Sequence, residues 1–136
     1  MESYTTTQVA DIVALPQRKI ISFVERGYVQ PSIKDASGAG SKRRWNYHDI
    51  LRCEITNLLL GVISVDAMRF IATFLCDDRR LVQGEELTIE FSKNGPTAPY
   101  SKFERSCNGA VESAAKITVS MNKVRETIDL QRVLPS

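Results

Sequence analysis

The chain has 136 residues, of which 43% are hydrophobic and 25% charged, and its formal net charge at pH 7 is +2. This length suits about one ordinary domain with a core of its own. No apolar run approaches the roughly 18 residues that a transmembrane helix needs, and the start MESYTTTQ lacks the cationic and apolar parts of a secretory signal. The three cysteines are widely spaced, so a disulfide framework is not expected and a reducing cytosol is favoured.

The basic residues are concentrated in one part of the chain. Residues 17–52 hold eight lysines and arginines against three acidic residues, whereas residues 53–136 hold ten basic and eleven acidic residues. A local basic excess of this kind is typical of a nucleic-acid-binding surface, although an uneven but ordinary protein surface would show the same count.

Two short helices are predicted near the start of the chain. Residues 6–14 carry apolar side chains at three- and four-residue spacing, and Thr6 or Thr7 is placed to cap them. Pro16 interrupts this pattern and can begin a second helix over residues 17–26, because the first turn of a helix has no partner for the missing N–H.

A polar loop follows the second predicted helix. Gly27 is placed to end that helix in a left-handed conformation. Residues 32–45 are rich in Ser, Gly, Lys and Arg, which predicts a hairpin or loop, and Gly38 and Gly40 permit a sharp reversal of the chain. Trp45, at the end of this loop, is expected to anchor it in the core.

Two further helices are predicted after the loop. Asn46 and Asp49 resemble a capping box at the start of a helix over residues 47–60, and Ser64 is placed to cap the helix that follows. His48 lies in the first turn of the third helix, where we interpret it as a surface or DNA-backbone-contacting residue rather than a catalytic one.

The C-terminal part of the sequence has a different character. Residues 77–86 read as a helix end and a linker. Alternating apolar residues predict strands over residues 87–92 and 117–121, and the last segment predicts a helix capped by Asn122.

Two short helices joined by a tight turn, the second with exposed polar and basic side chains, predict a helix-turn-helix motif. The first turn of the second helix would meet base edges in the major groove, where Arg can pair with guanine and Gln with adenine. The following loop would form a basic wing along the sugar-phosphate backbone. The residues expected to contact DNA are Gln17, Arg18, Lys19, Ser22, Arg26, Lys42, Arg43 and Arg44.

The stretch YTTTQVADIVALPQRKIISFVERGYVQP resembles the opening of the mercury-resistance regulator (MerR) family. The positions that match the family pattern are Tyr4, Thr5, Val9, Ala10, Ile20, Phe23, Gly27, Pro31, Arg43, Trp45, Asn46, Asp49, Arg52, Ser64, Val65 and Met68. The resemblance covers about residues 4–76, and it implies the winged helix-turn-helix domain of a transcriptional regulator.

The sequence also departs from the family pattern. Ile21 stands where the family has an arginine in the recognition helix, and Ala14 stands where the turn has a glycine. EELTIEFSKNGPTAPYSK occupies the place of the family's long dimerisation helix and shows no heptad repeat. The family's coiled-coil dimer is therefore not expected here.

No arrangement of residues in the sequence indicates catalysis. Cys53, Cys76 and Cys107 are interpreted as small buried hydrophobes rather than metal ligands. There is no Ser/His/Asp set, acid pair or phosphate-binding glycine loop to be seen in the sequence. We expect no enzyme activity, no metal and no cofactor.

These observations predict a mainly helical α+β protein. It would comprise a winged helix-turn-helix DNA-binding domain over residues 1–76, a linker over 77–86, and a small strand-and-helix portion over 87–136 that dimerises or binds a ligand. The expected function is a cytoplasmic, nucleoid-associated transcriptional regulator that binds double-stranded DNA as a homodimer, with no membrane partner. A small-molecule or protein effector is left open.

Two other functions remain open on the sequence. One is a phage-type architectural or packaging DNA binder, such as an excisionase or a small terminase subunit. The other is a winged-helix protein-interaction module, whose basic wing would face an acidic partner.

Overall fold

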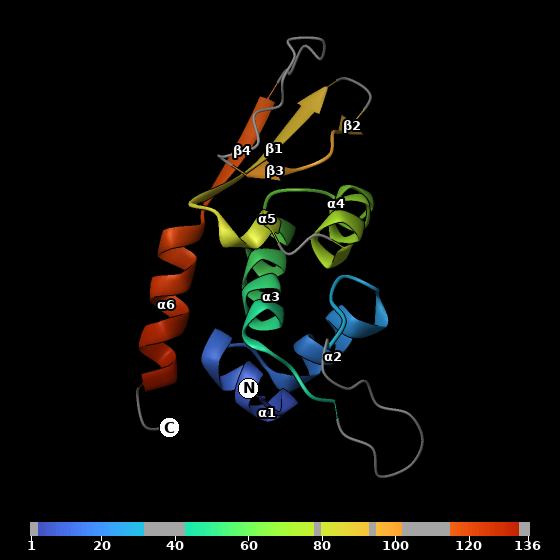
Figure 1. Cartoon of the computed structure of the whole chain (residues 1–136). Coiled ribbons are helices and arrows are strands. Elements are labelled where there is room, and N and C mark those ends of the chain that lie inside the picture. Colours follow the sequence, from blue (N-terminus) through green and yellow to red (C-terminus); the bar gives the residue numbers. More distant parts are fainter. Residues whose placement is uncertain (1–2, 32–42, 78–79, 93–94, 102–114, 134–136) are drawn as a thin grey trace.

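The computed structural model describes residues 3–31, 43–77, 80–92, 95–101 and 115–133. The elements in chain order are α1 (Thr6–Val13), α2 (Gln17–Glu25), α3 (Tyr47–Leu60), α4 (Val65–Asp77), α5 (Arg80–Gln83), β1 (Glu86–Ser92), β2 (Gly95–Pro96), β3 (Tyr100–Ser101), β4 (Ala115–Ser120) and α6 (Met121–Val133). A helical body carries a small sheet at one end (Figure 1), which confirms the predicted mainly helical α+β class. None of the described helices has the length and apolar character needed to cross a membrane.

The helix α1 begins one residue earlier than the predicted caps require. The Thr5 hydroxyl accepts a hydrogen bond from the Gln8 amide at 3.2 Å, and the Gln8 side chain accepts one from the Thr5 amide at 2.8 Å. The prediction of Thr6 or Thr7 as the cap is therefore wrong. Thr5 takes this role because only it has a Gln three residues later, which closes a reciprocal capping box.

The turn between α1 and α2 consists of Ala14, Leu15 and Pro16. Ala14 has φ +57° and ψ +44°, a left-handed conformation that is costly for a residue with a Cβ atom. Its amide donates to the carbonyls of Ala10 and Asp11, so this residue closes α1. Pro16 occupies the N-cap position of α2 in an extended conformation and forms no side-chain capping bond, so the helix starts directly after it, at Gln17.

The central helix α3 begins with the predicted capping box. Asn46 and Asp49 exchange backbone–side chain hydrogen bonds, each 2.9 Å long. Asp49 also forms a 2.9 Å salt bridge with Arg52, and both side chains are buried. The predicted cap of α4 is confirmed as well, because the Ser64 hydroxyl accepts a hydrogen bond from the Ala67 amide at 3.1 Å.

The sheet is antiparallel and is organised around β1. One edge of β1 pairs with β4 from Glu86 opposite Ser120 to Phe91 opposite Ala115, and the other edge pairs with β2 at one end and β3 at the other. Leu87 and Ile89 point into the core, as the predicted alternation requires.

The strand predicted over residues 117–121 is β4, and it ends at Ser120. Met121 instead begins α6, and the Ser120 hydroxyl accepts a hydrogen bond from the Lys123 amide at 3.4 Å. The prediction of Asn122 as the cap is therefore wrong, because the Asn122 side chain accepts a hydrogen bond from Arg125 at 2.9 Å and lies inside the helix.

The predicted linker over residues 77–86 contains a short helix, α5, that packs into the core. Leu81 and Val82 are buried, because their apolar side chains gain free energy by leaving water. Buried side chains from Val9 to Ile128 form one hydrophobic cluster. The N-terminal helices, α5, β1 and α6 thus share a single core.

The guanidinium of Arg125 connects α6 to the segment after α5. It donates to the carbonyl oxygen of Val82 at 3.0 Å and to that of Gly84 at 2.7 Å. These bonds satisfy carbonyl groups that the short helix α5 leaves without intrahelical partners.

We predict that Ala14→Gly stabilises the protein. Glycine adopts the left-handed conformation without the steric cost of a Cβ atom, and this gain outweighs the added entropy of the unfolded chain, so the free energy of unfolding should rise by about 0.5 kcal/mol. Ala72→Gly, inside α4, is the matched control and should lower stability by about 1 kcal/mol or more. Urea denaturation would measure the free energy of unfolding of both variants. If Ala14→Gly is less stable than the wild type, the left-handed conformation of Ala14 does not strain the fold.

We also predict that Arg125→Met destabilises the fold by about 2 kcal/mol, because hydrogen bonds from a charged donor to two carbonyl groups are lost. Lys123→Met removes an exposed cation from the same helix and should change stability by less than about 0.5 kcal/mol. If Arg125→Met and Lys123→Met have the same melting temperature, the hydrogen bonds of Arg125 contribute nothing to stability.

Candidate nucleic-acid interface

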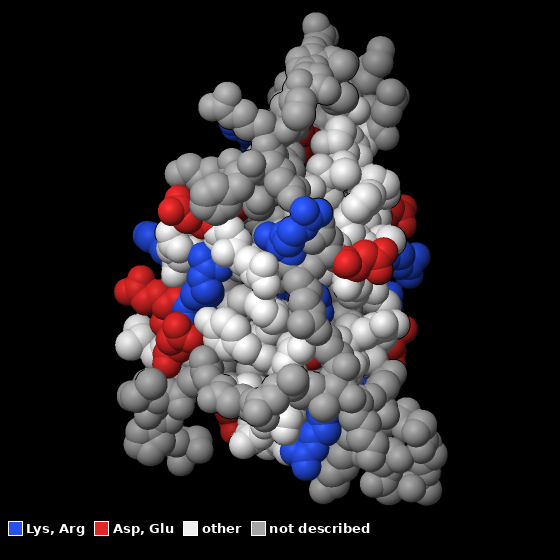
Figure 2. Space-filling model, in the orientation of Figure 1, with Lys and Arg blue, Asp and Glu red and all other residues white. Residues whose placement is uncertain are grey.

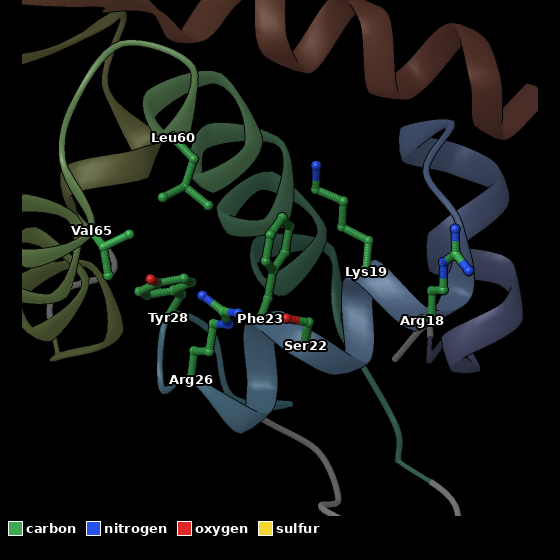
Figure 3. Close-up of a pocket in the computed structure, with 8 residues that line it drawn as sticks. All are labelled: Arg18, Lys19, Ser22, Phe23, Arg26, Tyr28, Leu60 and Val65. Atoms are coloured by element: carbon green, nitrogen blue, oxygen red, sulfur yellow. The ribbon is translucent and has the colours of Figure 1, made fainter.

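The polar face of α2 opens onto a cleft. Arg18, Ser22 and Arg26 follow one another at four-residue spacing, and Lys19 lies beside them, so their side chains project from one side of the helix and its end. All four line the same cleft (Figure 3), whose volume is about 530 Å³. The opposite face of α2 is buried, with Ile20 and Phe23 in the core.

The remainder of the cleft is apolar and aromatic. Phe23 and Tyr28 pack with ring centroids 6.3 Å apart, and Leu60 from the end of α3 and Val65 from the start of α4 complete the lining. Figure 3 shows Arg26 beside the two aromatic rings and Arg18 at the other end of α2, near α1. The cleft therefore combines a basic rim with an apolar wall.

The three cations of the cleft are available to an external anion. Within the described part of the chain, the side chains of Arg18, Lys19 and Arg26 form no hydrogen bond or ion pair. All three are exposed. The structure thus brings these three predicted DNA-binding residues together with Ser22.

Arg52, one of the basic residues of the segment 17–52, contributes no charge to the surface, and its acidic partner Asp49 is buried with it. Arg52 is 3% exposed and pairs with Asp49, so it belongs to the core. On the face drawn in Figure 2, basic and acidic side chains are interspersed. The positive charge of the cleft therefore arises from a few local side chains.

Gln17 is exposed at the first position of α2, but its side chain already has a partner. Its carbonyl oxygen accepts a hydrogen bond from the Thr7 hydroxyl of α1 at 3.3 Å. This bond orients the amide toward α1, while the second lone pair of its oxygen and its NH2 group are left for pairing with adenine.

The end of the predicted wing is fixed to the start of the chain. Trp45 is fully buried, its backbone pairs with Tyr4, and its indole N–H donates to the Thr6 hydroxyl at 3.0 Å. The prediction that Trp45 is a core anchor is confirmed. Arg44, which precedes it, is exposed, whereas Arg43 is half-buried.

Lys42 and the predicted wing residues 32–41, including Gly38 and Gly40, lie outside the described residues. The spatial relation of the whole wing to α2 is therefore still a prediction from the sequence.

Two of the cysteines lie on helices, in line with their interpretation as packing residues. Cys53 is fully buried, and burial raises the pKa of its thiol well above the ordinary range. Cys76 is half-buried, its thiol donates to the Tyr28 carbonyl at 3.8 Å, and burial raises the pKa of this thiol too. Cys107 lies outside the described residues. The described residues contain no cluster of His, Cys, Asp and Glu that could hold a metal.

Sequence reasoning missed the apolar wall of the cleft. Tyr28, Leu60 and Val65 come from the segment after α2, the end of α3 and the start of α4. The sequence could have indicated Val65 as a surface residue, since it is the first residue after the predicted cap Ser64 and its side chain need not point into the core. Tyr28 and Leu60 carry no such signal, because an apolar residue at a helix end is as consistent with core packing as with a site.

No protein family model matches this chain, and no curated protein is significantly similar to it in sequence.

Proposed function

We propose that this protein is a sequence-specific DNA-binding regulator that places α2 in the major groove. The observation that carries the proposal is the convergence of Arg18, Lys19, Ser22 and Arg26 on one open face of α2. This helix is the second of a tightly connected pair, and its opposite face is buried, so it can present the polar face to a duplex. The major groove, about 12 Å wide, admits such a helix.

The two ends of α2 have different roles in this proposal. Arg18 lies in the first turn, the part of a recognition helix that meets base edges, and its guanidinium can donate two hydrogen bonds to guanine. Arg26 follows the last residue of α2 and would contact phosphate. The wing residues Lys42, Arg43 and Arg44 would lie along the neighbouring backbone and contribute affinity without sequence preference.

The resemblance of residues 4–76 to the MerR family supports a transcriptional rather than a packaging role. The turn at Ala14 is consistent with that resemblance, because Ala14 adopts the left-handed conformation at the position where the family has glycine. The regulator would act in the cytoplasm at the nucleoid, with neither enzyme activity nor a cofactor.

We further propose that the protein binds DNA as a homodimer, because a single short helix reads few base pairs and two half-sites multiply specificity. Among the described strands, β4 pairs only with β1, and in this proposal its other edge would pair with the same edge of a second chain. Two copies joined at this edge would need no coiled coil.

Replacing Lys42, Arg43 and Arg44 with Ala should weaken binding to every duplex. The slope of log K against log salt concentration should fall by about 0.9 for each phosphate contact that is lost. Fluorescence anisotropy titrations over a salt series would measure this slope.

Two single substitutions serve as the control for this experiment. Arg44→Ala should reduce the slope, whereas Lys123→Ala removes the same charge from α6, which is separated from α2 by α3 (Figure 1), and should leave it unchanged. If both variants behave alike, binding depends on net charge alone and the wing has no specific role.

Arg18→Ala should change sequence preference. Loss of a bidentate contact to guanine removes about 1–3 kcal/mol of discrimination at one base pair, whereas Arg26→Ala should weaken binding to all sequences evenly. Selection of bound sites from random duplexes, carried out with wild type and both variants, would compare the preferences. An unchanged preference in Arg18→Ala would place the reading residues elsewhere.

Gel-shift titration at low salt separates the remaining functions. Discrete complexes on a selected site, without bending, support the regulator, and cooperative coating or bending supports the architectural or packaging binder. If no duplex is bound even at low salt, the proposed function fails and a protein-interaction module is favoured.

A further inference from the structure

The wall of the cleft contains a buried hydroxyl group. Tyr28 is only 2% exposed, and its hydroxyl has no hydrogen-bond partner among the residues that the structure describes. Buried hydroxyl groups in proteins almost always have a partner, because burial without one forfeits their hydration. The ring belongs to the lining of the cleft, and its oxygen points toward Val65 at the start of α4 (Figure 3). This oxygen is covered in the free protein, so a molecule in the cleft bonds it only when the neighbouring Val65 side chain moves aside.

The apolar wall around this hydroxyl is also incompletely covered. Val65 is 42% exposed although it lines a concave surface, and Leu60 and Phe23 lie beside it. A volume of about 530 Å³ lies within the range of small-molecule sites, which are mostly apolar with a few convergent polar groups. The cleft has the size and the lining for a ligand with one ring or a short apolar chain.

The charged groups at the cleft determine which sign of charge a ligand must carry. Arg26 lies beside the Phe23 and Tyr28 rings, and Lys19 and Arg18 follow along α2 (Figure 3). Among the described residues that line the cleft, none is acidic. An anionic group is therefore attracted here, and a guanidinium can bond a carboxylate through two parallel hydrogen bonds.

We propose that the cleft binds a small organic acid. Its apolar or aromatic body would pack on Phe23, Leu60 and Val65, and its carboxylate would be held by Arg26 and accept a further hydrogen bond from the Tyr28 hydroxyl. The same cations would contact DNA, so the acid and the duplex exclude one another. This regulatory consequence rests on the proposed function, whereas binding of the acid does not. Because linkage is reciprocal, the acid weakens DNA binding by the same factor by which DNA weakens acid binding.

The first experiment uses the free, full-length protein without DNA. The probe is 3-phenylpropanoate, and its neutral amide is the matched control. Amide chemical shifts in NMR spectra should move for the cleft residues as the acid is added, with a dissociation constant of about 1 mM, which is typical of a ligand of this size. The amide should bind at least about five-fold more weakly, since it lacks the charge that Arg26 selects. Equal binding of acid and amide, or shifts confined to other surfaces, would overturn the proposal.

Tyr28→Phe tests the hydroxyl itself. Loss of one hydrogen bond should weaken binding of the acid about five-fold, while the melting temperature of the free protein stays the same or rises, because an unpartnered buried hydroxyl is removed. A purely structural role predicts the reverse: unchanged binding of the acid and a lower melting temperature. That result would overturn the proposal.

Tyr47→Phe is the matched control for this change. It removes a hydroxyl that donates to Asp129 at 3.0 Å, away from the cleft, so it should leave acid binding unchanged. Arg26→Gln should weaken binding of the acid and leave binding of the amide unchanged. If Arg26→Gln affects both probes equally, the carboxylate is not held by Arg26.

A competition experiment separates this inference from the proposed function. Addition of 3-phenylpropanoate should displace a labelled duplex from the wild type, and about five-fold more acid should be needed with Tyr28→Phe. If the acid binds the cleft but no duplex binds, the proposed function fails and the ligand site stands. If a duplex binds but the acid does not enter the cleft, the ligand site fails and the proposed function stands.

Discussion

The burial of Trp45 determines how the N-terminal helices are held together. Its indole N–H bonds the Thr6 hydroxyl, and its backbone exchanges hydrogen bonds with Tyr4 at 2.8 and 2.9 Å. A large aromatic group with its polar atom satisfied contributes apolar burial and a defined orientation at once. Because Thr6 begins α1 and Trp45 leads into α3, this contact fixes the two helices against which α2 packs. It also leaves Arg44 on the outside, next to a rigid anchor.

The cleft follows from this arrangement, because α2 turns an apolar face to the core and a polar face to the solvent. Ile20 and Phe23 face the core, while Arg18, Ser22 and Arg26 remain outside. The ends of α3 and α4 then come close to α2 without covering it, so apolar side chains and cations share one concave surface. Such a surface can serve a polyanion through its charges and a small acid through its apolar wall.

Two local costs in the fold are compatible with a functional surface. Ala14 holds a left-handed conformation that glycine would adopt more easily, and the Tyr28 hydroxyl is buried without a partner among the described residues. Strained backbone and unsatisfied polar groups persist only where surrounding contacts impose them. At Ala14 the imposing contacts are the amide bonds that end α1 and the packing of α2 directly after the turn. The buried Asp49–Arg52 pair is different, since both of its charges are matched.

The amino-acid sequence by itself determined the four N-terminal helices to within one or two residues, together with the strand β1. Caps, prolines and apolar periodicity act between residues a few positions apart, so Asn46 and Ser64 could be recognised as caps without a structure. Where two local signals competed, the tertiary structure decided. Thr5 rather than Thr6 caps α1, because Gln8 completes its capping box while the Thr6 hydroxyl accepts from the Trp45 indole, and Ser120 rather than Asn122 caps α6.

The site was determined only in part by the sequence. Arg18, Lys19, Ser22 and Arg26 could be placed on one helix face from their spacing alone. Only the tertiary structure brought the apolar wall to them and assigned Arg52 to the core instead of the basic surface. Contacts between residues far apart in the chain leave no periodic pattern, and burial depends on what packs above a residue rather than on its neighbours in sequence.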